Sequence, residues 1–417
     1  MPRERGYSAN VRPWVYWMLT ATAVGCRLDY ELGADATRIS VVGGNGGGGN
    51  VAGSSASSGT SSAAEAGAGA EPLADAGGAA GSPANEAGSG AATGECPTGS
   101  ADCDQDPLDC EVDLTSDAAN CGVCGQSCLG AACVGGRCEP ATLVPDLIDG
   151  GGIAIDTEHL YVTDRSGEIL RVSKLDGAVD TLASGEAQPL AIAVDGSHAY
   201  WTTYLSSGEI RRVALAGGMP ETVASNEPFP VDIALDDTHV YWPQDATSTS
   251  DIMRTPKEPG VATPISSGHP FPHSIAVDAD GVYFTTWVNN GAVTAAALDG
   301  TSTTPLATAL KSPLGLALAG GRLFATIQTG GTLVSVSTAG GDAQTLLTGL
   351  RKPSAVAADA AGTVFWCNDG DGTVEALLDG ATTATPLGSY AGLRDIAVDQ
   401  NYVFVLTAND VVRIPKP

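Results

Sequence analysis

One four-residue phrase, Ile-Ala-Val-Asp or a close variant, recurs seven times in the second part of the chain and limits the fold more than any other feature. Successive copies begin 39 to 42 residues apart. They begin at Ile153, Ile192, Ile233, Ile275, Leu316, Val356 and Ile396. A fixed period of this length indicates one supersecondary unit that is repeated and packed against its own copies.

Each repeat contains the signals of four short strands. The phrase itself is apolar, and an aromatic or branched pair such as Tyr200-Trp201 follows it. A third apolar segment comes next, and then an Asp-Gly or Gly-Gly pair such as Gly217-Gly218 supplies the positive φ of a tight hairpin. A last short strand ends the repeat. Four hairpin-linked strands in about 40 residues make one β-propeller blade, so we predict an all-β, seven-bladed propeller over residues 141–417.

The last-strand phrase predicts how the ring closes. It also occurs seven times, but its first copy, Thr142-Leu143, precedes the first blade, and the seventh blade stops at Ile414 without a copy. We therefore predict that the N-terminal strand completes the C-terminal blade, which leaves no exposed edge blade. A parallel β-helix is the rival repeat architecture, but its rungs are shorter and need fewer turns in each period.

Two family resemblances support the propeller. The segment from Tyr200-Trp-Thr-Thr203 to Gly217 resembles a YWTD repeat, and the run of Ile-Ala-Val-Asp phrases is similar to NHL and virginiamycin-lyase-like propellers. The resemblance covers residues 142–417. It implies the propeller fold, together with either partner binding or the metal-assisted chemistry of lactonase and lyase propellers.

Composition divides the 417 residues into four segments. Residues 1–26 are basic and then apolar, 27–95 are dominated by Gly, Ala and Ser, 96–140 hold eight of the ten cysteines, and 141–417 hold the repeats. The second segment has too few large apolar residues to offset its ordering entropy, so we predict a disordered tether. The chain thus has a leader, a tether, a cysteine-rich module and a propeller.

The leader predicts export. Arg3, Arg5 and Arg12 precede a short apolar stretch that ends at Cys26, as in a secretory signal. Ala23-Val-Gly-Cys26 resembles the lipobox of bacterial lipoproteins, which implies a lipid on Cys26 and an anchor at the bacterial cell envelope, in the outer membrane or at the cell surface. A plain signal peptide with an incidental Cys26 is the alternative.

The net charge argues against one class of partner. The chain carries 48 Asp and Glu against 20 Lys and Arg, a formal charge of -28. Binding to nucleic acid needs clustered cations, and the sequence has no basic stripe. We therefore expect no nucleic-acid partner.

The cysteine-rich module is too short to build a core without cross-links. Its even count, the exported setting and the lack of a nearby histidine favour four disulfides of undetermined connectivity over a zinc site. Residues 113–128 resemble the Cys-Gly-x-Cys-Gly repeats of secreted myxobacterial surface proteins, which implies a surface or spacer module. The cysteines are Cys96, Cys103, Cys110, Cys121, Cys124, Cys128, Cys133 and Cys138.

Four acidic residues of this module have the spacing of part of a calcium loop. Asp102, Asp104, Asp106 and Asp113 occupy positions 1, 3, 5 and 12 of that pattern, although Pro107 stands where the pattern needs glycine. Calcium is therefore one hypothesis for the segment, and a solvated acidic loop is the other.

The candidate ligand site lies on one face of the predicted ring. Loops that lead into the innermost strands and loops that join the second and third strands share this face. They carry Asp164, Tyr204, Asp232, Asp245, His273, Trp287, Asp369 and Arg394, with His269, Asn368 and Asp395 beside them. We favour binding of a protein, peptide or glycan by a scaffold protein. The alternative is a metal-assisted hydrolase or lyase in which His273 is the general base and Asp232 or Asp369 holds a divalent metal.

Other repeated polar residues have a structural explanation. The aspartates that end the repeated phrases are expected to accept hydrogen bonds from backbone amides of their own turns. His159, His198 and His239 recur at one repeat position, which favours a role in the hairpins on the opposite face. Cys367 lies beside Trp366 in a strand and is expected to be a buried, small apolar residue.

Overall fold

The structure is a computed structural model in which 32 strands and no helix are assigned among the described residues. It describes residues 98–101, 103, 112–125, 127–128, 130–175, 177–246, 248–258 and 260–417. The predicted leader and tether, with Cys26, lie outside these residues, as do Cys96, Cys110, Asp102, Asp104 and Asp106. No helix in the described part of the chain is long and apolar enough to cross a membrane.

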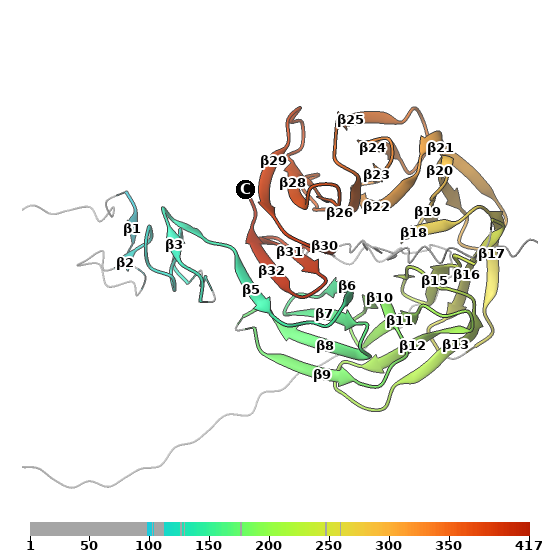
Figure 1. The fold of residues 1–417 in the computed structure, drawn as a ribbon, viewed down its shortest axis with the longest axis horizontal. Coiled ribbons are helices and arrows are strands. Elements are labelled where there is room, and N and C mark those ends of the chain that lie inside the picture. Colours follow the sequence, from blue (N-terminus) through green and yellow to red (C-terminus); the bar gives the residue numbers. More distant parts are fainter. Residues whose placement is uncertain are drawn as a thin grey trace, which may run out of the picture. The chain divides into compact units, whose positions relative to one another are not determined.

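Seven four-stranded antiparallel sheets form a ring, which confirms the predicted blades (Figure 1). Blade 1 contains β6 (Gly150–Ile155), β7 (His159–Asp164), β8 (Glu168–Ser173) and β9 (Val179–Ala183). Blade 2 contains β10 (Pro189–Val194), β11 (His198–Thr203), β12 (Gly208–Ala214) and β13 (Glu221–Glu227). Blade 3 contains β14 (Ala234–Leu235), β15 (His239–Pro243), β16 (Ser250–Pro256) and β17 (Thr263–His269).

The remaining blades follow the same plan. Blade 4 contains β18 (Pro272–Val277), β19 (Val282–Thr286), β20 (Asn289–Ala296) and β21 (Thr303–Lys311). Blade 5 contains β22 (Pro313–Ala319), β23 (Arg322–Ile327), β24 (Thr332–Ser337) and β25 (Gln344–Thr348). Blade 6 contains β26 (Pro353–Ala358), β27 (Val364–Asn368), β28 (Thr373–Leu377) and β29 (Thr385–Ser389).

Blade 7 is closed by the N-terminal strand, as the sequence predicts. It contains β30 (Leu393–Val398), β31 (Tyr402–Thr407) and β32 (Val411–Pro415), and its fourth strand is β5 (Ala141–Val144). In the register, Val144 pairs with Val411 and Thr142 pairs with Val412. The strand that precedes the first blade therefore completes the last blade of the ring.

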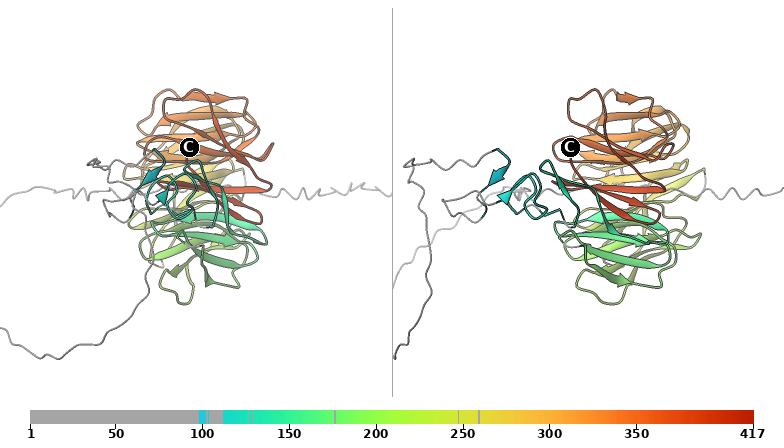
Figure 2. Two further views of the ribbon diagram at one scale, coloured as in Figure 1. Left: turned by 90° about the vertical axis from the view of Figure 1, so that its left-hand side faces the viewer. Right: turned by 60° about the vertical axis from the view of Figure 1, so that its left-hand side comes forward.

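The hydrophobic core lies between neighbouring blades. Seen from the side, the sheets of the ring are stacked on one another (Figure 2). One core cluster joins Ala154 and Tyr161 of blade 1 to Ile192 and Trp201 of blade 2. The small alanines of the inner strands let the strands approach the axis, while the aromatic rings of the second strands fill the wider space between sheets. Each blade is thus stabilised by its neighbours.

The hairpin glycines have the predicted backbone conformation. Gly177, Gly217, Gly300, Gly340 and Gly380 all have positive φ, between 71° and 89°. Residues with a side chain are strained there, whereas glycine is not. These glycines fix the turns between the third and fourth strands of their blades.

The described part of the cysteine-rich module contains four two-residue strands and three disulfides. The strands are β1 (Ser100–Ala101), β2 (Val112–Asp113), β3 (Cys133–Val134) and β4 (Arg137–Cys138). The disulfides join Cys103 to Cys124, Cys121 to Cys133 and Cys128 to Cys138. The prediction of disulfides is confirmed for these six cysteines.

Candidate functional site

The two faces of the ring differ in how they are built. We call the loop face the side formed by the segments that lead into the innermost strands and by the loops between the second and third strands. We call the turn face the opposite side, formed by the turns between the first and second and between the third and fourth strands. Alternating strand direction in each sheet fixes this division. The predicted ligand residues lie on or just below the loop face.

One backbone hydrogen bond repeats in all seven blades of the loop face. In six blades the first residue after the second strand donates its N–H to the carbonyl of the residue that precedes the innermost strand, and in blade 3 Asp245 makes the equivalent bond to Phe229, which precedes Pro230; the seven bonds measure 2.7 to 3.1 Å. The donors are Arg165, Tyr204, Asp245, Trp287, Gln328, Asp369 and Ala408, and the acceptors are Asp149, Gln188, Phe229, Phe271, Ser312, Lys352 and Gly392. The backbone is therefore uniform around the ring, whereas the side chains that it presents differ from blade to blade.

The acceptor residues are held in an uncommon conformation. Gln188, Phe229, Phe271, Ser312 and Lys352 each precede a proline and have φ between 44° and 60°. A proline excludes the right-handed helical region for the residue before it, and positive φ is costly for residues with a side chain. The strained backbone conformation occurs at the same position, just before the proline, in five blades. Strained, fixed loop residues are typical of binding positions on a rigid scaffold.

Aromatic side chains gather on the loop face of blades 2 to 4. The rings of Tyr204 and Phe229 lie 5.4 Å apart. Phe271 and Trp287 are 38% and 39% exposed, and the Trp287 amide donates to the Phe271 carbonyl. We call Tyr204, Phe229, Phe271 and Trp287 the aromatic arc. Phe229 and Phe271 were not predicted as site residues, although their shared position before a proline is visible in the sequence.

His273 lies beneath the aromatic arc and does not have the properties of a strong base. Its ring makes an edge contact with Trp287, with 5.8 Å between centroids. The side chain is buried, and its Nδ1 has no hydrogen-bond partner among the described residues. Burial lowers the pKa of His273 to about 4, so the imidazole is neutral and weakly basic at pH 7. A general base works best with a pKa near the working pH.

Asp245 is the most perturbed acid of this region. Burial raises its pKa to about 6, and the Tyr204 hydroxyl, at 3.3 Å, opposes this shift only in part. Asp369 of blade 6 is similar, because burial raises the pKa of its carboxyl while the Ser354 hydroxyl donates to it over 2.6 Å. Both carboxyls stay near the surface of the loop face.

The opposite half of the loop face is charged. Arg394 donates to Asp149 at 2.9 Å, and Arg165 lies 3.5 Å from the other oxygen of the same carboxylate. Asp164 is 4% exposed and accepts hydrogen bonds from the Ile148 and Ser166 amides. The loop face is therefore aromatic over blades 2 to 4 and ionic where blade 7 meets blade 1.

Two buried aspartates bridge adjacent blades. Asp232, just before β14, accepts the amide of its neighbour Ile233 and the amide of Ile275 in blade 4. Asp395 accepts the amides of Ile396 in its own strand and Ile153 in blade 1. Carboxylate oxygens used in this way fix the inner strands to each other, which explains both residues structurally.

The repeated aspartates and histidines of the turn face behave as expected. Asp236 accepts the amides of Thr238 and His239, and the corresponding aspartates of blades 1, 2, 4, 6 and 7 bind their own turns in the same way. The ring of His239 contacts Thr238 in the same turn. Cys367 is fully buried, as expected. Within the described residues, none of these features requires a ligand.

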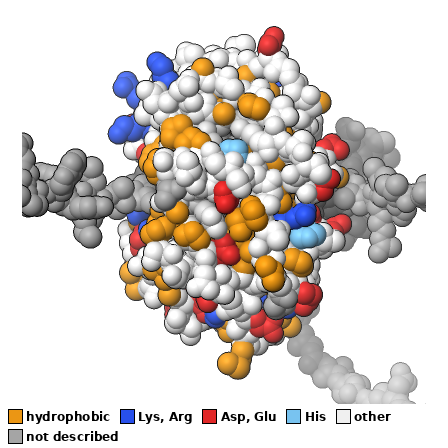
Figure 3. Space-filling view, turned by 90° about the vertical axis from the view of Figure 1, so that its right-hand side faces the viewer, with side chains coloured by type: hydrophobic (Ala, Val, Ile, Leu, Met, Phe, Trp, Pro, Cys, Tyr) orange, Lys and Arg blue, Asp and Glu red, His pale blue; other side chains and the backbone are white. Residues whose placement is uncertain are grey.

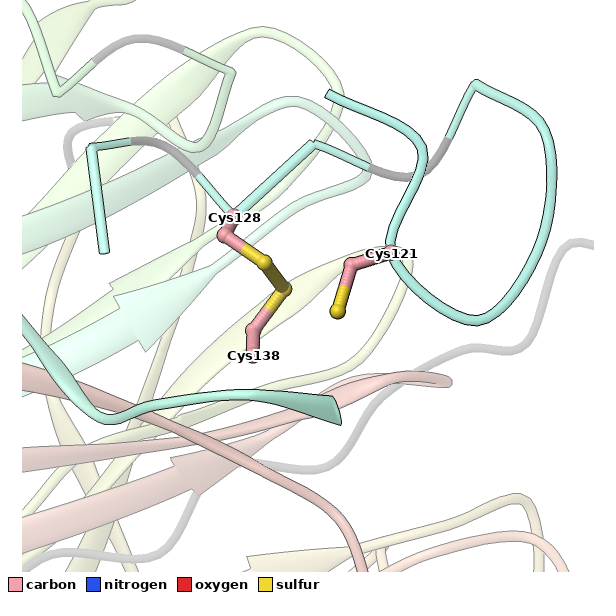
Figure 4. A group of neighbouring side chains, drawn as sticks. All are labelled: Cys121, Cys128 and Cys138. Atoms are coloured by element: carbon pink, nitrogen blue, oxygen red, sulfur yellow. A yellow bond between two sulfur atoms is a disulfide. The ribbon is translucent and has the colours of Figure 1, made fainter. Parts of the chain in front are cut away.

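The potential metal ligands of the cysteine-rich module are paired with each other. Within the described ranges, one group of three His, Cys, Asp or Glu side chains has its donor atoms within 4.8 Å of one another: Cys121, Cys128 and Cys138. Figure 4 shows the Cys128–Cys138 bond with the Cys121 sulfur beside it, and Cys121 is bonded to Cys133. Sulfur atoms in disulfides are not thiolate ligands.

Calcium binding stays a prediction, because three of its four aspartates lie outside the described residues. The fourth, Asp113, accepts hydrogen bonds from the amide and hydroxyl of Thr115 and from the Ser116 hydroxyl. These bonds lower the pKa of the Asp113 carboxyl.

The side of the molecule shown in Figure 3 has no large hydrophobic patch among the described residues. Hydrophobic side chains lie there in several small groups that alternate with uncharged, acidic and basic side chains. Scattered groups of this kind are normal for a folded protein.

The comparisons with known proteins concern the fold. No protein-family model and no curated protein sequence matches this chain. The structure of virginiamycin B lyase from Staphylococcus aureus has 15% sequence identity and a TM-score of 0.57, over 67% of this chain and 99% of the lyase. A catalytically inactive His-to-Ala variant of that lyase with quinupristin matches equally well. The WD40 propeller of Doa1 has 14% identity and a TM-score of 0.56, over 66% and 95% of the two chains. The chain is therefore a seven-bladed β-propeller, similar in fold to virginiamycin B lyase and to a WD40 propeller, that follows a disulfide-bonded module.

Proposed function

We propose that the loop face of the propeller binds a protein, peptide or glycan, and that the chain is a recognition or scaffold protein of the cell envelope. The aromatic arc carries this proposal. It presents large, rigid apolar side chains on a backbone that seven equivalent hydrogen bonds hold in place. Aromatic side chains with little conformational freedom dominate the energetics of many binding surfaces.

The charged half of the face would orient the ligand. Asp149, Arg165 and Arg394 form an ion-pair group that is only partly buried. Such groups contribute little net affinity but select register and partner. A peptide segment or sugar chain could then place an apolar part on the aromatic arc and a polar part over these charges.

The test is a screen of the full chain on peptide and glycan arrays, followed by titration of the best ligand. The double substitution Phe271→Ala and Trp287→Ala should weaken binding about 30-fold or more, because each removes a contact worth about 1 to 2 kcal/mol. Met219→Ala is the control, since Met219 is 88% exposed in a turn-face hairpin. Equal affinity of the double variant and the control would contradict the proposal.

A metal-assisted hydrolase or lyase is the second candidate, and Asp245 is the observation that favours it. A carboxyl whose pKa is about 6 can exchange protons near neutral pH, and perturbed acids are frequent in active sites. Quinupristin, found with the similar lyase, and simple lactones are suitable substrates to test with Mg²⁺ or Ca²⁺ present. If Asp245→Asn abolishes turnover, catalysis at this carboxyl is supported. If turnover is unaffected by the substitution, the catalytic site lies elsewhere.

The envelope location is also a proposal, and its support is the sequence of residues 1–26. A lipid on Cys26 would hold the chain at a membrane, and residues 27–95 would separate the propeller from the surface. Binding on the loop face and attachment through the N-terminal segment are compatible, because they involve different parts of the chain.

A further inference from the structure

A cavity of 850 Å³ opens on the turn face, opposite the predicted ligand residues. The turns after the first strands of blades 2 to 5 form its rim, and two residues that follow third strands, Lys257 and Leu298, complete it. Both kinds of segment belong to the turn face. Pockets for small molecules usually measure about 300 to 1,000 Å³, so this cavity is large enough for a ligand.

The wall of the cavity is apolar. It is formed by the ends of the innermost strands of five blades, where Ile155, Val194, Leu235, Val277 and Leu318 stand at or next to the last position. All five belong to strands whose backbones pair within their own sheets, so the wall is preformed. Apolar walls of this kind bind the hydrocarbon part of a ligand by removing it from water.

The rim is acidic. The lining residues include four carboxylates, Asp195, Asp236, Asp237 and Asp278, and one ammonium group, Lys257. Lys257 is paired with Asp195 at 2.8 Å, and both side chains are at least four-fifths buried. The lining therefore has an excess of three negative charges after Lys257 is counted.

The remaining carboxylates differ in how strongly they are held. Asp236 and Asp278 accept hydrogen bonds from their own turns and from the hydroxyls of Tyr241 and Tyr283. Asp237 is exposed at the rim. A fixed negative potential thus surrounds the mouth, with one exposed carboxylate available for a direct ion pair.

We propose that this turn-face cavity binds a small amphiphilic cation, whose hydrocarbon part contacts the inner-strand wall and whose positive charge lies at the rim near Asp237. Charge complementarity selects this class over a fatty acid or another amphiphilic anion. The proposal is independent of the loop-face function, because the two sites share no residue.

The test uses three probes with the same tail and different heads: octyltrimethylammonium, octanol and octanoate, each below its micelle concentration. Calorimetric titration of the full chain should give the order cation, alcohol, anion, with the cation at least tenfold tighter than the anion. Equal affinities for the three, or no binding of the cation, would overturn the proposal.

Two matched charge substitutions locate the site. Asp237→Lys should weaken binding of octyltrimethylammonium about five- to tenfold and strengthen binding of octanoate, because two unit charges near the head group change. Glu168→Lys makes the same charge change at an exposed residue of the loop face and should have little effect. Equal effects of the two substitutions would mean that binding depends only on the net charge of the protein. That result would contradict the proposed site.

A filling substitution tests the cavity itself. Val277→Trp places an indole at the wall and should abolish binding of octyltrimethylammonium, whereas Trp287→Ala in the aromatic arc should leave it unchanged. Binding by a folded Val277→Trp protein, or loss of binding in Trp287→Ala, would place the probe elsewhere. If Val277→Trp does not fold, the two charge variants decide the question.

Discussion

Trp201 and Trp242 show how a single indole joins two blades through a hydrogen bond. Trp366 is the equivalent tryptophan of blade 6, and it lacks the glutamate that accepts this bond. The indole N–H of Trp201 donates to Glu186 at 3.2 Å, and that of Trp242 donates to Glu227 at 3.1 Å. In both pairs the glutamate stands fifteen residues before the tryptophan. In blade 6 the turn between the first two strands is one residue longer, and Leu350 occupies the equivalent position, because its amide donates to Gly331 as that of Glu186 donates to Gly167. Among the described residues, the buried N–H of Trp366 has no hydrogen-bond partner. An unpaired buried donor is destabilising.

Leu350→Glu should therefore be more stable than Leu350→Ala by about 1 kcal/mol, which is the typical net contribution of one hydrogen bond. Urea unfolding at pH 7 measures the difference. Leu350→Ala is the control for removal of the leucine alone and should not give the gain. A Glu variant no more stable than the Ala variant would show that the carboxylate does not reach the indole.

Asp245 predicts a pH dependence of stability. Its pKa is raised in the folded state to about 6, so the folded protein loses this proton less readily than the unfolded chain. The destabilisation is absent below about pH 4, develops as the pH rises, and is complete above the folded pKa. Asp245→Asn should be more stable than the natural protein by about 1 to 2 kcal/mol at pH 8 and equally stable at pH 4.

Denaturant unfolding of both proteins at the two pH values checks this prediction. Asp342→Asn, an exposed change in the turn between β24 and β25, is the control and should give no pH-dependent difference. A constant offset for Asp245→Asn at pH 4 and pH 8 would mean that titration of this carboxyl does not affect stability.

At the scale of the element, the turns of five blades are completed in one of two ways. In blades 1, 3 and 4 a tyrosine hydroxyl of the second strand donates to the turn aspartate, as Tyr241 does to Asp236. In blades 6 and 7 the corresponding residue is phenylalanine, and a lysine of the following blade binds the aspartate instead: Lys416 to Asp359 and Lys174 to Asp399. In these two blades a cation from the next blade takes the place of the missing hydroxyl, whereas in blade 2 Lys257 of blade 3 pairs with Asp195 although Tyr200 is present.

The Lys416 pair should contribute to closure of the ring. Lys416→Met should destabilise the protein by about 2 kcal/mol, because Asp359 is 5% exposed and would lose its cation partner. A double-mutant cycle with Asp359→Asn isolates the pair, and the double variant should recover part of the loss. Strict additivity of the two single effects would show that the residues do not interact.

Periodicity predicted the strands and the closing strand, because both depend on local patterns that recur in every blade. The large cavity on the turn face was not predictable from these local patterns. Asp237 and Val277 lie at repeat positions that look purely structural, and only the packing of five inner strands makes them line one space. Similarly, the sequence identified Trp287 and His273 but not the burial that makes His273 a weak base.

At the scale of the whole molecule, the cysteine-rich module contacts the closing blade. Arg413 of β32 is 1% exposed, lies 4.5 Å from the centre of the Tyr402 ring, and donates to the Cys128 carbonyl. Arg137 donates to the Lys416 carbonyl at 3.0 Å. In blades 1 to 3 the corresponding arginines bind a carbonyl of the next blade, as Arg171 binds that of Leu215. The module therefore provides blade 7 with the contact that a following blade provides elsewhere.

The proposed anchor gives a prediction at the same scale. Cys26→Ser should move the protein from the membrane fraction to the soluble fraction and remove the mass of the lipid from the mature chain. Cell fractionation and mass spectrometry of the intact protein measure both effects. Cys367→Ser is the control, because this cysteine is buried in blade 6 and should not affect anchoring. Unchanged membrane retention of Cys26→Ser would leave the plain signal peptide as the explanation.

The pairing of β5 with β32 also determines how the ring responds to mechanical force. A pull on the chain before Ala141 is transmitted to the propeller through β5, whose hydrogen bonds run across the direction of the strand. These hydrogen bonds then bear the load together, in shear, and do not break one after another. If β5 yields, blade 7 loses its fourth strand and the other six blades keep theirs. Tension from the N-terminal side would thus expose one sheet edge, that of β32, while most of the ring stays folded.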